Sequence, residues 1–392
     1  MKEFQEGSLA VAEIVRMCKP GVVSAYPITP QTHIVEELAQ MVANGDLKAQ
    51  CINVESEHSA ASAVFGASAA GVRSYTATSS QGLFYMAEVL FNIAGVRLPI
   101  VMTCANRAIS APINIWNDQQ DAVSLRDCGW VQVYAEDAQE AVDLHMIAYR
   151  LAEDKNIMLP VMVNMDGFVL THGIETVDMP SQEQVDKYLP SYTPLYKLDI
   201  KNPMTIGPLV DPDYYMETRY AIQETHKSVL GMLPKLTEEF SKVFGRTYNG
   251  LVEGYRLDDA EKAFVAMGSV CGTTKEAIDS MRKKGKKVGL LKISCYRPFP
   301  HQAIYEALKN VKKVAVLDRA LSLGSYAPLA SEIKSVFFGK KKGPQTISSF
   351  IVGLGGRDIT VHSIEEAYKR IGKKETCEFI DLKPELLKEN YA

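Results

Sequence analysis

Two short segments near the N-terminus carry residue types that suit acid–base chemistry on a small ligand. Tyr26–Pro30 places the hydroxyl of Thr29 beside prolines, which restrict the backbone and so hold the hydroxyl in place. Val54–His58 delivers the carboxyl group of Glu57 to the start of an Ala-rich stretch. A carboxylate there is either a helix-end anion, stabilised by the helix dipole, or a buried acid with a catalytic role. On the residues alone, both interpretations stay open.

A third segment, Asn106–Asp121, offers a cation to an anionic substrate. Its Arg107 carries a planar guanidinium with two parallel donors, a geometry that matches a carboxylate. The alternative is a structural ion pair with Asp118 or Asp121 of the same segment. The spacing of these residues leaves both interpretations open.

Each of these segments follows a predicted strand. Short apolar runs separated by longer amphipathic stretches are typical of β-α units that build a mostly parallel sheet. One stretch, predicted as a helix over His58–Gly71, consists almost entirely of Ala, Ser, Gly and Val. Side chains this small indicate close packing, so we expect this helix to be buried in the centre of its domain. The predicted strands are Gly21–Ala25, Ala49–Val54, Arg73–Thr78, Pro99–Cys104 and Met158–Val163.

The pattern changes from Thr171 to about Asn249, where prolines and tyrosines are frequent. We predict an extended crossover there, followed by one long helix over Tyr214–Phe244. Strand-like runs then resume, which indicates a second and smaller α/β domain. We therefore expect one domain at residues 1–250 and another at residues 251–392. The strands predicted for the second domain are Ala263–Gly268, Val288–Ile293, Val314–Asp318 and Ile347–Gly353.

Composition and cysteine spacing argue against several classes of protein. Of the 392 residues 46% are hydrophobic, and 43 Lys and Arg against 47 Asp and Glu leave a formal charge of -4. We expect a globular protein that does not bind nucleic acid, because its net charge is slightly negative. We also expect no membrane association, since no apolar run approaches the ~18 residues that span a bilayer. None of the seven cysteines forms a C-x-x-C pair, which argues against zinc ribbons and clustered thiolates. The odd cysteine count and the acidic N-terminus predict a cytoplasmic protein.

Two glycine-rich segments fail to match nucleotide-binding motifs. Gly268–Lys275 lacks the residue order of a P-loop and predicts a turn from a strand into a helix. Gly353–Asp358 has an aspartate where a dinucleotide-binding fingerprint needs its third glycine, so it predicts a tight turn.

Taken together in this order, five segments resemble the α subunit of the pyruvate:ferredoxin oxidoreductase (pyruvate synthase) family. The resemblance covers essentially the whole chain, and the order of the segments makes it specific. Tyr296–Pro300 also looks like the second domain of that family. The five segments are Tyr26–Pro30, Ser56-Glu57 with the Ala-rich stretch after it, Thr78–Gly82, Asn106–Asp121 and Gly353–Asp358.

The resemblance implies both a fold and an activity. The fold is α/β, with a thiamine diphosphate-binding domain of the pyrimidine type on a parallel sheet, followed by a domain like the C-terminal domain of transketolase. The activity is the cleavage of a 2-oxoacid, pyruvate, by thiamine diphosphate. Electrons pass through iron–sulfur clusters to ferredoxin, and the acyl group passes to coenzyme A.

The resemblance also implies roles for individual residues. Glu57 matches the glutamate that hydrogen-bonds N1′ of the aminopyrimidine ring, which lets the cofactor's own 4′-imino group remove the C2 proton. Thr29 and Arg107 match residues that meet the substrate, Arg107 through the substrate carboxylate. These three residues are expected to be catalytic. The residues expected to contact the cofactor are Pro27, Ile28, Thr29, Glu57, Ser80 and Gln81.

Two parts that such an enzyme needs are missing from the sequence. Thiamine enzymes bind Mg²⁺ and the diphosphate with a Gly-Asp-Gly segment, and the nearest candidate here, Met165–Gly167, lacks the first glycine. Clustered thiolates are missing too. We therefore expect no metal ligands in this chain and expect β, γ and δ subunits of a heterotetramer to supply Mg²⁺, the diphosphate site and the 4Fe-4S clusters. The active site is then an interface, and the tyrosine-rich crossover is expected to contact a partner.

Two alternatives compete with the pyruvate enzyme. A sister enzyme would act on a branched-chain 2-oxoacid, while oxalate is disfavoured because Thr29 is small and neutral where a doubly charged acid would need an arginine. A non-catalytic scaffold subunit would keep the fold alone. The presence of Thr29, Glu57 and Arg107 together argues against the scaffold.

Overall fold

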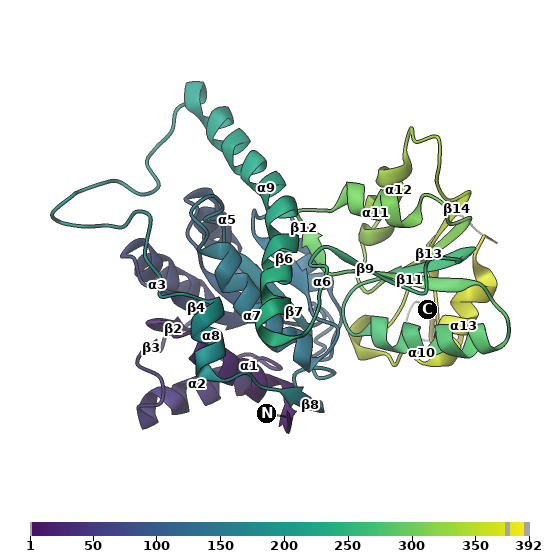
Figure 1. Ribbon diagram of the computed structural model, residues 1–392, viewed down its shortest axis with the longest axis horizontal. Coiled ribbons are helices and arrows are strands. Elements are labelled where there is room, and N and C mark those ends of the chain that lie inside the picture. The colour runs from purple at the N-terminus through teal and green to yellow at the C-terminus, as the bar shows by residue number, and fades with distance from the viewer. Residues whose placement is uncertain (1, 373–376, 388–392) are drawn as a thin grey trace. The chain divides into compact units, whose positions relative to one another are not determined.

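The chain forms two compact units, seen in a computed structural model that describes residues 2–372 and 377–387 (Figure 1). The first unit comprises Met1–Glu253 together with a returning segment, Ile293–Pro300. The second comprises Gly254–Lys292 and His301–Ala392. Within the described residues, no helix is both long and apolar enough to cross a membrane.

The first unit is built on a seven-stranded sheet with the order β12-β6-β7-β5-β4-β2-β3. All neighbouring strands run parallel except β12, which pairs antiparallel with β6. The predicted parallel sheet is therefore confirmed. The strands are β2 (Val22–Ser24), β3 (Gln50–Ile52), β4 (Ser74–Thr78), β5 (Val101–Asn106), β6 (Val131–Tyr134), β7 (Val161–Asp166) and β12 (Cys295–Arg297), with a separate antiparallel pair of β1 (Lys2–Glu6) and β8 (Ile174–Asp178).

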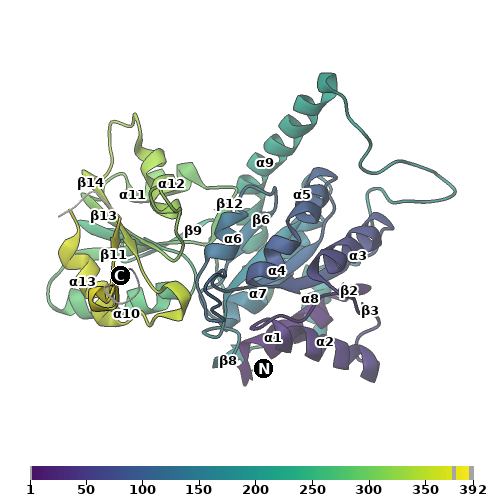
Figure 2. The same ribbon diagram turned by 180° about the vertical axis from the view of Figure 1, so that it is seen from behind.

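Helices cover both faces of this sheet, as β-α units require. Figure 1 shows one face with α1 (Gly7–Met17), α2 (Thr32–Asn44) and α7 (Ala138–Ala152). Figure 2 shows the opposite face, which carries the remaining helices of the sheet. Those are α3 (Glu57–Ala69), α4 (Ser80–Tyr85), α5 (Ala87–Gly95) and α6 (Gln120–Ser124).

Helix α3 is the helix of small residues, and it packs against β2 and β4 through one face only. Ala60, Ala61 and Val64 are fully buried, whereas Ser62 and Gly66 on the opposite face are exposed. Small side chains bring the backbone close to the sheet on the buried face, whereas no element among the described residues covers Ser62 and Gly66. The expectation that the helix is buried in the centre of its domain therefore holds for one face of the helix and not for the other.

The crossover after α8 (Gln182–Tyr188) leads into α9 (Pro212–Phe244), a helix of 33 residues. From Ile222 onward one side of α9 is buried, while the ten residues Pro212–Ala221 are exposed all round. In Figures 1 and 2 this first part of α9 extends away from the rest of the first unit. Part of the crossover before it contacts that unit, since the Leu198 amide donates to the Ala69 carbonyl oxygen at 2.8 Å and the Tyr196 hydroxyl to that of Val96 at 2.9 Å. An isolated helix of this length is only marginally stable in water, so the buried remainder of α9 supports it.

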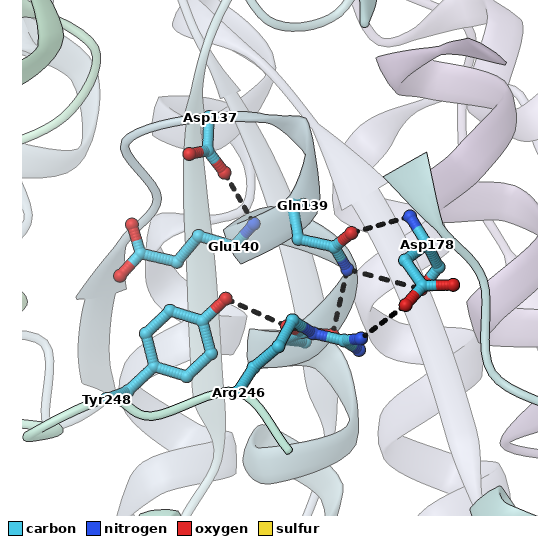
Figure 3. Close-up of polar contacts among 7 residues, drawn as sticks. Asp137, Gln139, Glu140, Asp178, Arg246 and Tyr248 are labelled. Carbon is cyan, nitrogen blue, oxygen red and sulfur yellow. Dashed lines mark hydrogen bonds and ion pairs between the residues drawn. The ribbon is translucent and has the colours of Figure 1, made fainter. Parts of the chain in front are cut away.

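The C-terminal end of α9 is fastened by a buried ion pair (Figure 3). Arg246 follows the helix and binds Asp143 of α7 through two hydrogen bonds, Nε to Oδ2 at 2.6 Å and Nη2 to Oδ1 at 2.7 Å. The Tyr248 hydroxyl donates to the same carboxylate at 2.8 Å. Burial raises the pKa of Asp143, and the hydrogen bond and charge of Arg246 oppose that rise. The pair therefore keeps a buried carboxylate satisfied and holds α9 against α7.

The second unit is a smaller α/β domain with the sheet order β15-β14-β13-β10-β11-β9. Strands β15, β14, β13, β10 and β11 of this sheet run parallel to one another. Its two glycine-rich segments are turns, as predicted, with Gly268, Gly353, Gly355 and Gly356 all at positive φ. The strands are β9 (Val252–Tyr255), β10 (Lys262–Ala266), β11 (Val288–Ile293), β13 (Lys313–Asp318), β14 (Thr346–Ile351) and β15 (Glu378–Phe379), and the helices are α10 (Val270–Lys283), α11 (His301–Leu308), α12 (Pro328–Phe337) and α13 (Val361–Arg370).

Removing the cation of the buried pair should destabilise the first unit. We expect Arg246→Ala to lower the free energy of unfolding by about 3 kcal/mol, because it leaves the Asp143 carboxylate buried beside fewer donors. Denaturant unfolding of the full chain measures the change. The matched control is Lys242→Ala, which breaks the exposed pair with Glu238 and should leave the free energy of unfolding nearly unchanged, because water screens exposed pairs. Equal losses in the two variants would show that the buried pair does not fasten α9.

Candidate active site

The candidate site lies where the strand order of the first sheet reverses. β2 pairs with β3 on one side and with β4 on the other, and crevices at such reversals lie at the carboxyl ends of the strands. Gln31 bridges this opening and is fully buried. Its Nε2 donates to the carbonyl oxygen of Ala77 at 2.8 Å and to that of Tyr26 at 3.3 Å, while its Oε1 accepts from the Ile28 amide. Gln31 therefore shapes the loop that carries Thr29.

Glu57 is the first residue of α3 and projects toward α4. Its side chain is 8% exposed, and it contacts Gly82 so closely that a Cβ at Gly82 would lie 2.7 Å from Oε1 of Glu57. The same Cβ would lie 2.5 Å from the buried hydroxyl of Thr78. The structure shows no hydrogen bond or ion pair to the Glu57 carboxylate from any residue it describes, and the Thr78 hydroxyl is unpaired as well. A glycine cradle thus presents a buried carboxyl group that is available to a ligand.

Ser80 and Gln81 follow β4 at the start of α4. Ser80 is fully buried with φ +51, and its hydroxyl lies within hydrogen-bond distance of the Ala108 carbonyl oxygen and of Gln81 Oε1. These contacts commit Ser80 to the protein interior. The Nε2 group of Gln81 is buried and makes no hydrogen bond to the described residues, so it is an unused donor beside Ser80.

Arg107 follows β5 and is 6% exposed. Its Nη1 donates to the Thr29 carbonyl oxygen at 2.9 Å, and its Nε donates to the Asn114 carbonyl oxygen at 3.0 Å. Desolvation lowers the pKa of Arg107, and the charge of Asp121 opposes that effect. Among the described residues no carboxylate forms an ion pair with this guanidinium, and Nη2 makes no hydrogen bond there. The structure therefore brings Arg107 and Thr29 together and leaves one side of the guanidinium for an anion.

Asp121 lies behind these residues and is fully buried. Its carboxylate accepts five hydrogen bonds from protein donors: the backbone amides of Ser80, Arg107 and Ala122, the side-chain amide of Asn106 and, at 3.7 Å, the thiol of Cys104. Desolvation raises its pKa to about 6, and the hydrogen bonds oppose the rise. The residue pattern suggests Asp121 only as an ion-pair partner of Arg107, because nothing in the pattern indicates which backbone amides donate to the Asp121 carboxylate.

Exposed apolar and aromatic side chains belong to the same segments as the site residues. Such side chains on a polar surface are typical of a contact with another protein or a ligand. They are Tyr26 at 38% exposure, Phe84 at 38%, Tyr85 at 59%, Ile113 at 78% and Trp116 at 53%.

The described residues contain no group of three or more His, Cys, Asp or Glu side chains that could hold a metal ion. Asp166 of the Met165–Gly167 segment is buried and accepts a hydrogen bond from Gln119 at 3.2 Å. The chemical groups that the site presents are therefore a carboxyl group, an amide donor and a guanidinium. They suit an organic ligand with a ring nitrogen and a carboxylate.

Two family models match the chain, one in each unit. The description "Pyruvate flavodoxin/ferredoxin oxidoreductase, thiamine diP-bdg" matches residues 14–236, and "Pyruvate:ferredoxin oxidoreductase core domain II" matches residues 260–364. These descriptions agree with the resemblance found in the sequence.

Comparison with individual proteins gives the same result. Pyruvate synthase subunit PorA of Methanothermobacter thermautotrophicus is 52% identical over 96% of this chain and 97% of the relative. Ketoisovalerate oxidoreductase subunit VorA of Pyrococcus abyssi is 44% identical, covering 93% of this chain and 92% of the relative.

Solved structures show the same fold. A 2-oxoglutarate:ferredoxin oxidoreductase from Magnetococcus marinus superposes with a TM-score of 0.72 at 20% identity, over 94% of this chain; this chain spans 65% of that longer one. A split gene transketolase superposes with a TM-score of 0.53 at 12% identity, over 93% and 95% of the two chains. The expected thiamine-enzyme fold, with its likeness to transketolase, is confirmed. From its two family models and its full-length relatives, the chain belongs to the pyruvate:ferredoxin oxidoreductase family.

Proposed function

We propose that this chain is the α subunit of a thiamine-dependent pyruvate:ferredoxin oxidoreductase. The enzyme oxidatively decarboxylates pyruvate to acetyl-coenzyme A and carbon dioxide, reversibly, with ferredoxin as the electron acceptor. The observation that carries the proposal is the unpaired, buried carboxyl group of Glu57 in its glycine cradle, on the strand edge that also carries Arg107. The identity of 52% to a pyruvate synthase subunit supports pyruvate as the substrate.

The site residues fit thiamine diphosphate, which when bound supplies a carbon nucleophile for attack on a 2-oxoacid. Glu57 hydrogen-bonds N1′ of the aminopyrimidine ring and shares a proton with it, which a buried carboxyl group without a protein partner can do. The loop of Pro27 and Ile28 and the amide of Gln81 border the ring. The Ser80 hydroxyl is hydrogen-bonded within the protein, so Ser80 supports the side chain of Gln81 and leaves the contact with the ring to Gln81.

Arg107 and Thr29 hold the substrate in this proposal. The free side of the Arg107 guanidinium binds the 2-oxoacid carboxylate and orients the ketone for attack. The Thr29 hydroxyl donates to an oxygen of the substrate. The hydrogen bond from Arg107 to the Thr29 carbonyl oxygen fixes the position of Thr29 relative to the guanidinium. Orientation by such groups is what makes the reaction of bound partners effectively unimolecular.

Partner subunits complete the enzyme in this proposal. Residues 1–250 form the pyrimidine-binding domain and residues 251–392 the transketolase C-terminal-like domain. β, γ and δ subunits supply Mg²⁺, the diphosphate site and the 4Fe-4S clusters, and the complex works in the cytoplasm with ferredoxin and coenzyme A. The exposed tyrosines at the start of α9, Tyr214 at 66%, Tyr215 at 59% and Tyr220 at 64% exposure, support a contact with a partner.

A branched-chain 2-oxoacid is the second candidate substrate. The identity of 44% to a ketoisovalerate oxidoreductase subunit favours it to a lesser degree than pyruvate. The ratio of kcat/KM for pyruvate to kcat/KM for 2-oxoisovalerate, measured with the assembled complex, decides between the two substrates. A ratio above one supports pyruvate.

The role of Glu57 is tested by an isosteric change. Glu57→Gln keeps the shape of the side chain but cannot share a proton with the ring nitrogen, so we expect turnover to fall at least ~100-fold while the complex still assembles. Pyruvate-dependent reduction of ferredoxin measures the turnover. Glu238→Gln, at an exposed carboxylate of α9, is the control and should leave turnover unchanged. Full turnover in Glu57→Gln would refute the assigned role.

The glycine cradle is tested by Gly82→Ala. Alanine normally stabilises a helix relative to glycine by about 1 kcal/mol, but here its Cβ would displace the Glu57 side chain, since Thr78 is buried and cannot yield. We expect at least a ~10-fold fall in turnover, together with a loss of about 1–3 kcal/mol in the free energy of unfolding from overpacking. Gly231→Ala in α9 meets open space and should gain stability without affecting turnover. Unchanged turnover in Gly82→Ala would show that the position of Glu57 is not critical.

Substrate binding is tested at Arg107. Arg107→Lys keeps the positive charge but loses the planar fork, so we expect KM for pyruvate to rise about tenfold or more. Calorimetric titration of thiamine diphosphate into the same complex should give an unchanged affinity, because the lost contacts belong to the substrate. An unchanged KM would mean that another residue binds the carboxylate.

A further inference from the structure

We propose that Asp121 is a positioning residue of this active site, because one of its carboxylate oxygens joins the cofactor-facing turn after β4 to the substrate-facing turn after β5. The inference rests on the proposed function. Oδ2 of Asp121 accepts the backbone amide of Ser80 at 3.0 Å and that of Arg107 at 2.9 Å. The residues after Ser80 are Gln81 and Gly82, and Gly82 borders Glu57, so one carboxylate oxygen is bonded to both halves of the site.

The second carboxylate oxygen is held just as firmly. Oδ1 accepts from Asn106 Nδ2 at 2.9 Å and from the Ala122 amide at 2.7 Å. Ala122 belongs to α6, and Asn106 is the last residue of β5. Asn106 Nδ2 also donates to Asn164 Oδ1 on β7 at 3.1 Å. A carboxylate offers about four acceptor positions. Here four N–H donors use them, and the Cys104 thiol of β5 adds a longer contact to Oδ2 at 3.7 Å. The carboxylate is thus anchored to the sheet on one side while it holds both turns on the other.

The backbone at Ser80 needs such a contact. Its φ of +51 lies in the left-handed region, which residues other than glycine rarely adopt. Rare backbone conformations persist where surrounding contacts over-determine them, and hydrogen bonds to an ionised acceptor are about twice as strong as those between neutral groups. Burial raises the pKa of Asp121 only to about 6, so the carboxylate is ionised at neutral pH and acts as an acceptor alone.

An asparagine at this position cannot reproduce the arrangement. Asparagine supplies one acceptor oxygen where aspartate supplies two, so one pair of donors must face an NH₂ group, and the other pair loses its charged acceptor. Either orientation of the amide loosens the connection between the two turns. The expected signature is therefore a joint effect on cofactor binding and on substrate binding.

The experiment compares Asp121→Asn with a matched buried carboxylate. Asp318 is also fully buried and accepts two backbone amides, those of Leu329 and Ala330, but it lies in the second unit. In the assembled complex we expect Asp121→Asn to raise the dissociation constant of thiamine diphosphate, measured by calorimetry, and KM for pyruvate at least ~5-fold each. Asp318→Asn, in the other unit, should change neither constant by more than about twofold.

The outcomes are distinct. A loss of stability in Asp121→Asn with both constants unchanged, or an equal effect of Asp318→Asn on both constants, would overturn the positioning role. If Asp121→Asn does not assemble, Asn106→Ala removes one anchor of Oδ1 and should give the same joint increase at smaller size; no increase in either constant would refute the inference. The proposed function fails separately, if the unmodified complex neither binds thiamine diphosphate nor consumes a 2-oxoacid.

Discussion

The site depends on how the parallel sheet is held together where its strand order reverses between β2 and β4. Neighbouring strands diverge there, and backbone groups that would otherwise pair with each other need other partners. The side-chain amide of Gln31 supplies them for the Tyr26 and Ala77 carbonyl oxygens. The carboxylate of Asp121 does the same for amides after β4 and β5. Two buried polar side chains thus fix the backbone at the carboxyl ends of β2, β4 and β5.

This constraint explains why the groups that face the crevice can stay unpaired. Glu57, Thr78 and the Gln81 amide are buried or nearly so, and within the described residues none of the three groups is hydrogen-bonded toward the crevice. A buried polar group without a partner is costly, so a rigid surrounding and an expected ligand are both needed to keep it. The unusual backbone of Ser80 and the unpaired buried groups thus lie together at the carboxyl ends of the strands, where the cofactor is proposed to bind.

The sequence predicted most of the sheet because buried parallel strands are continuous apolar runs. One strand was misplaced: Met158–Val163 was predicted, but β7 covers Val161–Asp166, since Met158 has φ +46 and Pro160 cannot donate to a ladder. β6 was missed because Gln132, which is buried and donates to the Ala122 carbonyl oxygen, interrupts the apolar run of Val131–Tyr134. The burial of α3 was misjudged because composition shows how closely a helix can pack, but not how many of its faces are covered.

The candidate site was predicted in its reactive groups but not in its supports. Thr29, Glu57 and Arg107 stand out because their residue types follow predicted strands. Gln31, Gly82 and Asp121 do not, because their roles depend on which backbone atoms the fold brings to them.

The central claim is that Glu57 receives the aminopyrimidine ring at this edge of the sheet. A structure of the assembled complex with thiamine diphosphate tests it most directly. We predict a carboxyl oxygen of Glu57 within ~2.6–3.2 Å of N1′, a hydrogen-bond distance, with Arg107 Nη2 facing the substrate side of the cofactor. A ring that pairs with another carboxyl group, or lies beyond ~4 Å from Glu57, would contradict the account.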